Sequence, residues 1–126
     1  MYIFTKKIIS GEPIDVYNNG NMKRDFTYID DIVNGTRSAI DKNYKCEIFN
    51  LGNSKSEKLM DMIAIIEKEL DMKANINFLP LQAGEAPITF ADINYSKEMI
   101  SYYPKTNIKI GLPKFINWYK DYYNVK

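Results

Sequence analysis

Apolar residues recur at helical spacing in two long stretches of the chain. One stripe occupies a single helical face between residues 59 and 70, and the preceding Ser54–Glu57 stretch has the spacing of a capping box. A second stripe spans residues 112–123 and predicts a closing helix with Pro113 near its first turn. The first stripe consists of Leu59, Met62, Ile63, Ile66 and Leu70.

Three shorter helices are expected. Residues 4–10 read as the end of a helix that Gly11 and Pro13 stop. Residues 32–40 form a helix for which Asp30 or Asp31 supplies the N-cap, and residues 95–102 form another.

Strand signals fall between these helices. Residues 14–17 alternate in polarity, residues 26–29 read as extended, and residues 47–52 form an apolar run that ends in a glycine. Residues 76–79 form a further strand, stopped by Pro80, and Asn18–Asn21 is a turn because Asn and Gly tolerate positive φ. Alternating strands and helices predict an α/β fold, and 126 residues fit one domain, 1–126.

Composition removes several classes of function. The 17 basic and 16 acidic residues leave a formal net charge of +1, which favours neither a nucleic-acid partner nor an anionic membrane. The chain has no histidine and one cysteine, Cys46, which argues against a zinc site, a serine–histidine triad and a disulfide framework. With no apolar leader at its start, the chain is expected to be cytoplasmic.

The sequence also lacks a glycine-rich phosphate loop, so any dinucleotide-binding fold must lie outside it. Two Tyr-x-x-x-Lys pairs, Tyr2 with Lys6 and Tyr122 with Lys126, match a catalytic pair in which lysine lowers the tyrosine pKa. With ten tyrosines in the chain, we interpret both as chance.

The first candidate binding stretch runs from Asn18 to Asp31. Arg24 follows a turn that exposes backbone amides, and a guanidinium binds two phosphate oxygens at once. The competing interpretation is an ordinary surface pairing of Arg24 with Asp25 or Asp30.

The second candidate stretch is residues 81–87. A glycine there allows close backbone approach, and Gln82 and Glu85 offer groups for ligand hydroxyls. A carboxylate commonly accepts hydrogen bonds from a ribose diol. The alternative is an ordinary Gly-Pro surface loop.

Taken in order, three segments resemble one family. They are GEPIDVYNNGNMKRDFTYIDDIVNG (residues 11–35), IFNLGN (residues 48–53) and LPLQAGEAPITFAD (residues 79–92), followed by Trp118 and Tyr119. This pattern resembles the extended short-chain dehydrogenase/reductase epimerases of the NAD-dependent epimerase/dehydratase family, and most closely the UDP-glucuronate 4-epimerases. The resemblance implies the carboxyl-terminal, substrate-binding subdomain, with the Rossmann half and its catalytic pair absent.

By that resemblance, the site residues hold the nucleotide. Arg24 would bind the diphosphate, and Glu85 would take the place of a ribose-binding aspartate. Gln82 would stand where epimerases of UDP-galactose carry a phosphate-binding arginine, a substitution typical of the UDP-glucuronate branch. The residues implied for the uracil pocket are Ile14, Asp15, Val16 and Tyr17.

The implied reaction is epimerisation at C4 through a 4-keto sugar, with NAD bound by the absent domain. This chain would hold the UDP of a UDP-sugar, would be inactive alone, and would belong to a homodimeric parent. Two alternatives remain open at this point: a decarboxylase or dehydratase on the same scaffold, and a non-catalytic nucleotide-sugar-binding module.

Overall fold

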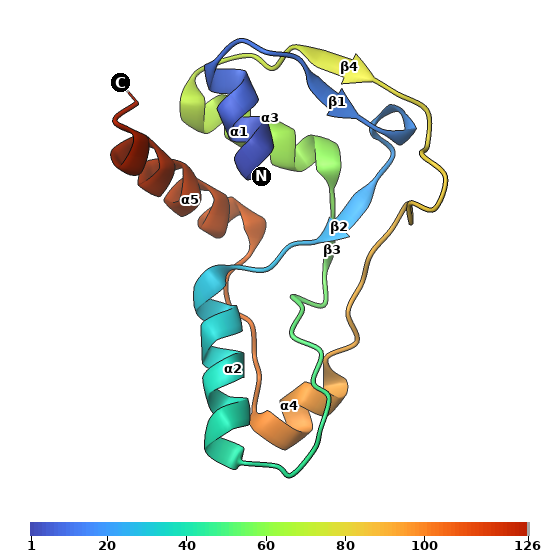
Figure 1. Ribbon diagram of the computed structural model, residues 1–126, viewed down its shortest axis with the longest axis vertical. Coiled ribbons are helices and arrows are strands. Elements are labelled where there is room, and N and C mark those ends of the chain that lie inside the picture. Colours follow the sequence, from blue (N-terminus) through green and yellow to red (C-terminus); the bar gives the residue numbers. More distant parts are fainter. Residues whose placement is uncertain (126) are drawn as a thin grey trace.

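The computed structural model describes residues 1–125, so Lys126 of the second Tyr-x-x-x-Lys pair lies outside the described part. Five helices, one 3-10 turn and four short strands alternate along the chain (Figure 1). In order they are α1 (Tyr2–Ile9), β1 (Ile14–Val16), η1 (Asn18–Gly20), β2 (Lys23–Asp25), α2 (Ile29–Lys42), β3 (Ser56–Lys58), α3 (Leu59–Leu70), β4 (Ile76–Phe78), α4 (Asn94–Ile100) and α5 (Ile108–Tyr123). The mixed α/β character predicted from the alternation is confirmed.

The strands form two separate pairs. β1 and β4 are parallel, with Ile14 opposite Ile76 and Val16 opposite Phe78. β2 and β3 are antiparallel, with Arg24 opposite Glu57. On its other edge β2 makes a parallel bridge from Lys23 to Ile88, so β2 lies between two neighbouring segments.

Two apolar cores stabilise the chain. The larger core joins α1, β1, α3 and α5, because each contributes the apolar face that its periodicity predicts. The smaller core lies between α2 and α4 at the other end of the molecule (Figure 1). The larger core is built from Ile8, Ile14, Val16, Met62, Ile63, Ile66, Ile108, Leu112 and Ile116. The smaller one is built from Ile93, Ile100 and Tyr102.

The helices are predicted correctly, but their N-terminal signals are not. Helix α2 begins at Ile29, so Asp30 and Asp31 lie inside its first turn and neither is the N-cap. Asp31 instead accepts hydrogen bonds from the backbone amides of Lys105 and Thr106. The Ser54–Glu57 capping box is also wrong, because part of it pairs as β3 and Lys58 precedes the helix without a side-chain cap.

Helix α5 starts four residues before the predicted stripe. The Asn107 side chain caps it by accepting from the amide of Ile110, which leaves Pro113 inside the helix rather than near its first turn. The carbonyl that Pro113 would obstruct is that of Lys109, in the first turn, where the loss of one bond costs least.

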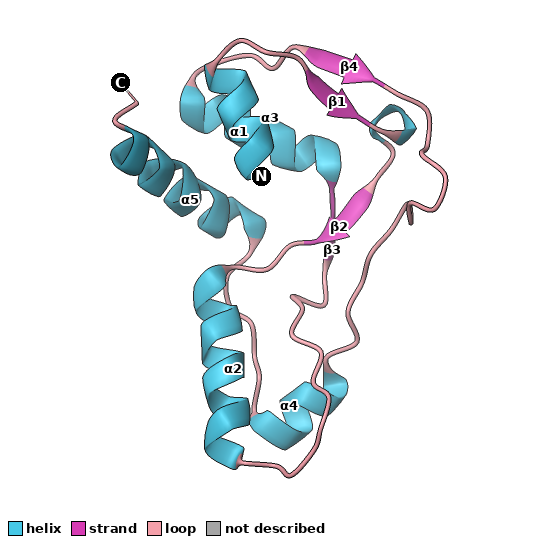
Figure 2. Ribbon diagram, in the orientation of Figure 1, coloured by secondary structure: helices cyan, strands magenta, loops and turns pink. Residues whose placement is uncertain are grey.

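The strand predicted over residues 47–52 is absent. Figure 2 draws the stretch between α2 and β3 as loop. Phe49 and Leu51 pack on the smaller core, whereas Ile48 is 86% exposed. A strand needs a hydrogen-bonding neighbour, and no described segment pairs with this one. The extended stretch expected at 26–29 likewise contains no strand, since the pairing falls on residues 23–25.

Much apolar surface remains uncovered. The chain exposes 8352 Å², whereas a compact protein of its mass exposes about 6,900 Å². Helix α2 contributes a stripe opposite its packed side: Ile29, Val33 and Ile40 are each more than half exposed. Among the helices that the structure describes, none is long and apolar enough to cross a membrane.

Candidate functional site

Arg24 lies at the centre of the candidate site. Its Nη1 atom donates to the carbonyl oxygens of Ala86 at 2.9 Å and Pro87 at 3.3 Å, and also to that of Lys23. Its Nη2 atom lies 3.4 Å from Oε1 of Glu85. The surface pairing with Asp25 or Asp30, the alternative left open by the sequence, is not what forms. Arg24 joins a loop 61 residues further along the chain.

Glu85 has one oxygen paired and one oxygen free. Oε1 meets Arg24, while Oε2 has almost no solvent contact and no hydrogen-bond partner in the described structure. A desolvated carboxylate oxygen without a donor is costly, so a movement of the Glu85 side chain that brings Oε2 to a ligand hydroxyl would stabilise it. The Arg24 side chain is 26% exposed and that of Glu85 37%, so both are within reach of a ligand.

The loop that carries Glu85 is fixed to β2. The amide of Lys23 donates to the carbonyl of Pro87 at 2.8 Å, and the amide of Thr89 donates to the carbonyl of Lys23 at 3.1 Å. The amide of Asp25 donates to Oγ1 of Thr89. These bonds explain how two sequence-distant stretches meet at one place.

Asp25 ties a third segment to this region. Its Oδ1 accepts from the amide of Asn53 at 3.0 Å, and its Oδ2 accepts from the amides of Ser54 and Ala91 at 3.1 Å each. The sequence reasoning treated Asp25 only as a surface partner of Arg24. The signal that distinguishes it, three backbone donors from two distant segments, exists only in the fold.

Gln82 lies at the exposed start of the same loop. Its carbonyl accepts from the amide of Glu85 at 3.1 Å, and Gly84 adopts φ +85°, so residues 82–85 form a tight turn that glycine favours. The structure therefore brings Arg24, Gln82 and Glu85 into one loop-and-strand unit.

The four residues implied for the uracil pocket divide into two kinds. Ile14 and Val16 are completely buried in the larger core. Asp15 is exposed and accepts from Nδ2 of Asn77 at 2.8 Å, and Tyr17 is half-buried. The amide of Leu79 donates to the carbonyl of Val16, and the carbonyl of Leu79 accepts from the amide of Asn19. β1 therefore ends beside the start of the Gln82 loop.

A tyrosine hydroxyl lies behind the Asp25 region. Tyr102 donates to the carbonyl of Gly52 at 2.9 Å. Burial raises the pKa of Tyr102, and the nearby charges of Asp31 and Asp25 raise it further. This tyrosine therefore stays a neutral hydrogen-bond donor at physiological pH, which suits a structural role.

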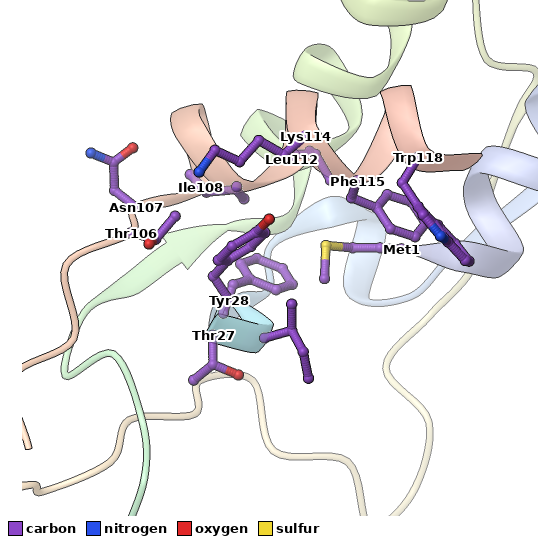
Figure 3. Close-up of a pocket in the computed structure, with 13 residues that line it drawn as sticks. Met1, Thr27, Tyr28, Thr106, Asn107, Ile108, Leu112, Lys114, Phe115 and Trp118 are labelled. Atoms are coloured by element: carbon purple, nitrogen blue, oxygen red, sulfur yellow. The ribbon is translucent and has the colours of Figure 1, made fainter. Parts of the chain in front are cut away.

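An apolar cavity of about 500 Å³ lies elsewhere, beside α5. Figure 3 shows Tyr28, Phe115 and Trp118 around it, with the ammonium of Lys114 5.2 Å from the centre of the Tyr28 ring. The periodicity of α5 assigns Phe115 and Trp118 to packing, and no polar pattern in the sequence indicates an opening there. Arg24 and Glu85 do not line this cavity.

The first Tyr-x-x-x-Lys pair has no catalytic environment. The Tyr2 hydroxyl lies 3.0 Å from that of Tyr123, within an aromatic group at the end of α5. The partner of the Tyr2 hydroxyl is therefore a second phenol, not the Lys6 ammonium. Lys6 itself is exposed on α1.

Comparison with known proteins identifies the family that this chain resembles. The model of the NAD dependent epimerase/dehydratase family matches residues 1–52. An uncharacterised protein of Methanocaldococcus jannaschii is 52% identical over 116 residues, covering 92% of this chain and 36% of that protein. UDP-glucuronate 4-epimerase 4 of Arabidopsis thaliana is 36% identical over 140 residues, covering 98% of this chain and 32% of that protein.

A solved structure agrees. A UDP-glucuronic acid 4-epimerase variant from Bacillus cereus, in complex with a UDP-fluoro-glucuronic acid and NAD, superposes with a TM-score of 0.83 at 30% identity. The match covers 95% of this chain and 39% of that one. The resemblance to the extended short-chain dehydrogenase epimerases is confirmed. It is to their carboxyl-terminal part, close to the UDP-glucuronate 4-epimerases, and the chain spans well under half of each of these three proteins.

Proposed function

We propose that this chain is the UDP-sugar-binding part of a UDP-glucuronate 4-epimerase-like enzyme. One observation carries the proposal: Arg24 and Glu85, from a strand and a distant loop, form a cation–carboxylate pair with a free carboxylate oxygen. A guanidinium suits a diphosphate and a carboxylate suits a ribose diol, so together they match the chemistry of a nucleoside diphosphate.

The proposed division of labour follows from the reaction. C4 epimerisation requires the sugar to present both faces of C4, so the enzyme must hold the nucleotide firmly and the hexose loosely. Arg24, Gln82 and Glu85 would provide this one-ended hold. Asp15 and Tyr17 would flank the base, on and just after the strand that carries the buried Ile14 and Val16.

NAD does not fit the residues present. The parallel pair β1–β4 is followed by a 3-10 turn on one strand and a long loop on the other, and no glycine-rich loop opens a helix within residues 1–125. Any hydride chemistry would therefore belong to the part of such enzymes that this chain does not match. We accordingly propose that the chain alone does not turn over UDP-glucuronate.

Calorimetric titration tests the proposal. UDP, uridine and UDP-glucuronate are titrated into the chain. UDP is expected to bind more tightly than uridine, because the diphosphate reaches Arg24, and UDP-glucuronate is expected to gain little more than UDP. Equal affinities for uridine and UDP would contradict a contact between Arg24 and the diphosphate. Measurable epimerisation by the chain alone would contradict the proposal that it only holds the nucleotide.

A further inference from the structure

Asp25 and Arg24 hold one segment at its two ends. Arg24 binds the carbonyls of Ala86 and Pro87, and Asp25 binds the amide of Ala91. Neighbouring residues of a strand point to opposite sides, so this short strand reaches both ends of the 86–91 segment at once. Asp25 additionally fixes the turn at Asn53 and Ser54, which leads into β3.

The fold leaves room for this carboxylate. A Cβ atom at Gly52 would lie 2.2 Å from Cβ of Ala91 and 2.8 Å from Oδ2 of Asp25. Any larger residue would therefore separate the three segments that Asp25 joins. A charged acceptor with several backbone donors is among the strongest hydrogen-bonding arrangements in proteins.

We infer that Asp25 is a positioning residue for ligand binding at the Arg24–Glu85 site. Its carboxylate accepts hydrogen bonds from the amides of Asn53, Ser54 and Ala91, and none from Arg24, Gln82 or Glu85. By fixing Ala91 and the Asn53–Ser54 turn against β2, it keeps the loop of Glu85 where Arg24 meets it. The inference rests on the proposed function for its ligand. The physical reason is that a smaller fraction of molecules with the loop correctly placed gives a proportionally weaker apparent affinity.

The matched control is Asp31. Like Asp25, it is an aspartate whose carboxylate accepts only from backbone amides. Its two donors are the amides of Lys105 at 3.1 Å and Thr106 at 2.9 Å, and neither belongs to the site loop. Asp25→Asn and Asp31→Asn each replace one acceptor oxygen by an NH₂ group that faces a backbone donor. Both variants should therefore lose thermal stability.

Affinity should separate the two variants. At a temperature where circular dichroism shows both to be folded, we expect Asp25→Asn to weaken UDP binding about fivefold or more, and Asp31→Asn to leave it within twofold. In the Arg24→Ala background, Asp25→Asn should have almost no further effect on UDP affinity, because its action passes through Arg24. Equal effects of the two aspartate variants, or full additivity with Arg24→Ala, would overturn the inference.

Loop order provides a readout that needs no ligand. Backbone ¹⁵N relaxation of residues 82–91 should show increased motion in Asp25→Asn and not in Asp31→Asn. If the chain binds no UDP, the proposed function fails while this measurement still decides the role of Asp25. If Arg24→Ala weakens UDP binding but Asp25→Asn changes neither affinity nor loop motion, the function stands and the inference is wrong.

Discussion

The guanidinium of Arg24 lies 3.4 Å from the carboxylate of Glu85, across a loop that the same arginine holds by two carbonyl oxygens. The free protein thus supplies its own partial counter-ion to the cation that we assign to the diphosphate. A bound diphosphate would compete with Glu85 for Arg24. Removing the charge of Glu85 should therefore affect binding of the diphosphate and binding of the ribose differently.

Replacing Arg24 by alanine should cost UDP affinity. Loss of a charged hydrogen-bonded contact should weaken binding by about 1.5–3 kcal/mol, measured by calorimetry. Arg37→Ala is the control, since Arg37 forms an exposed pair with Asp41 on α2 and its side chain is 76% exposed. Unchanged UDP affinity in Arg24→Ala would exclude Arg24 from the site.

Replacing Glu85 by glutamine should separate the two ends of the ligand. Loss of the negative charge frees Arg24, so inorganic pyrophosphate should bind a few-fold more tightly. Uridine should bind more weakly, because one of the two carboxylate acceptors for a ribose diol is replaced by a donor. A change of both affinities in the same direction would argue against this assignment of roles.

Stability should fall at alkaline pH through Tyr123. The hydrogen bond between the Tyr123 and Tyr2 hydroxyls is the largest cause that raises the pKa of Tyr123 from 10.0 to about 12. Because folding raises this pKa, the stabilising contribution is intact below pH 10 and is lost as the pH rises to about 12.

Ultraviolet titration of the phenols checks this assignment. Tyr123 should ionise late in the native protein, as should the buried Tyr102, and Tyr2→Phe should shift one late phenol back toward 10. Tyr103→Phe is the control, because Tyr103 is 60% exposed. An unchanged late-ionising fraction in Tyr2→Phe would show that the late phenols are tyrosines other than Tyr123.

A core truncation should test the larger apolar cluster. Ile66 is fully buried between α3 and its neighbours, so Ile66→Ala should reduce the free energy of unfolding by about 2–5 kcal/mol. Ile48→Ala removes the same atoms from a side chain that is 86% exposed and should change it by less than about 0.5 kcal/mol. Urea denaturation measures both, and similar losses in the two variants would contradict the burial that distinguishes them.

Local pattern predicted the helices because a helix completes its hydrogen bonds within one segment. The apolar face of Met62, Ile63 and Ile66 could therefore be predicted from the sequence of that segment alone. The structure of the stretch around Ile48 could not be predicted in this way, since a strand needs a hydrogen-bonding neighbour that only the fold supplies. Asp31 illustrates the same limit, because a residue typical of an N-cap instead binds backbone 74 residues away.

The residues of the candidate site likewise include some that the sequence predicted and some that it did not. Arg24, Gln82 and Glu85 were identifiable through the order of the family pattern, and their meeting in one unit agrees with it. The role of Asp25 and the cavity beside Trp118 depend on contacts between distant segments. Contacts of this kind produce no recurring pattern in the sequence from which they could be predicted.

The separation of the apolar residues into two cores affects how the molecule opens. Within residues 1–125, backbone connections and the short strands around β2 join the end that holds Ile66 to the end that holds Tyr102, and the two ends have separate apolar cores. Amide protons of α2 and α4 should therefore exchange with solvent through a partial opening that leaves α3 and α5 protected. A ligand that bridges β2 and the Glu85 loop would suppress that opening, so nucleotide binding should slow hydrogen exchange far from the nucleotide itself.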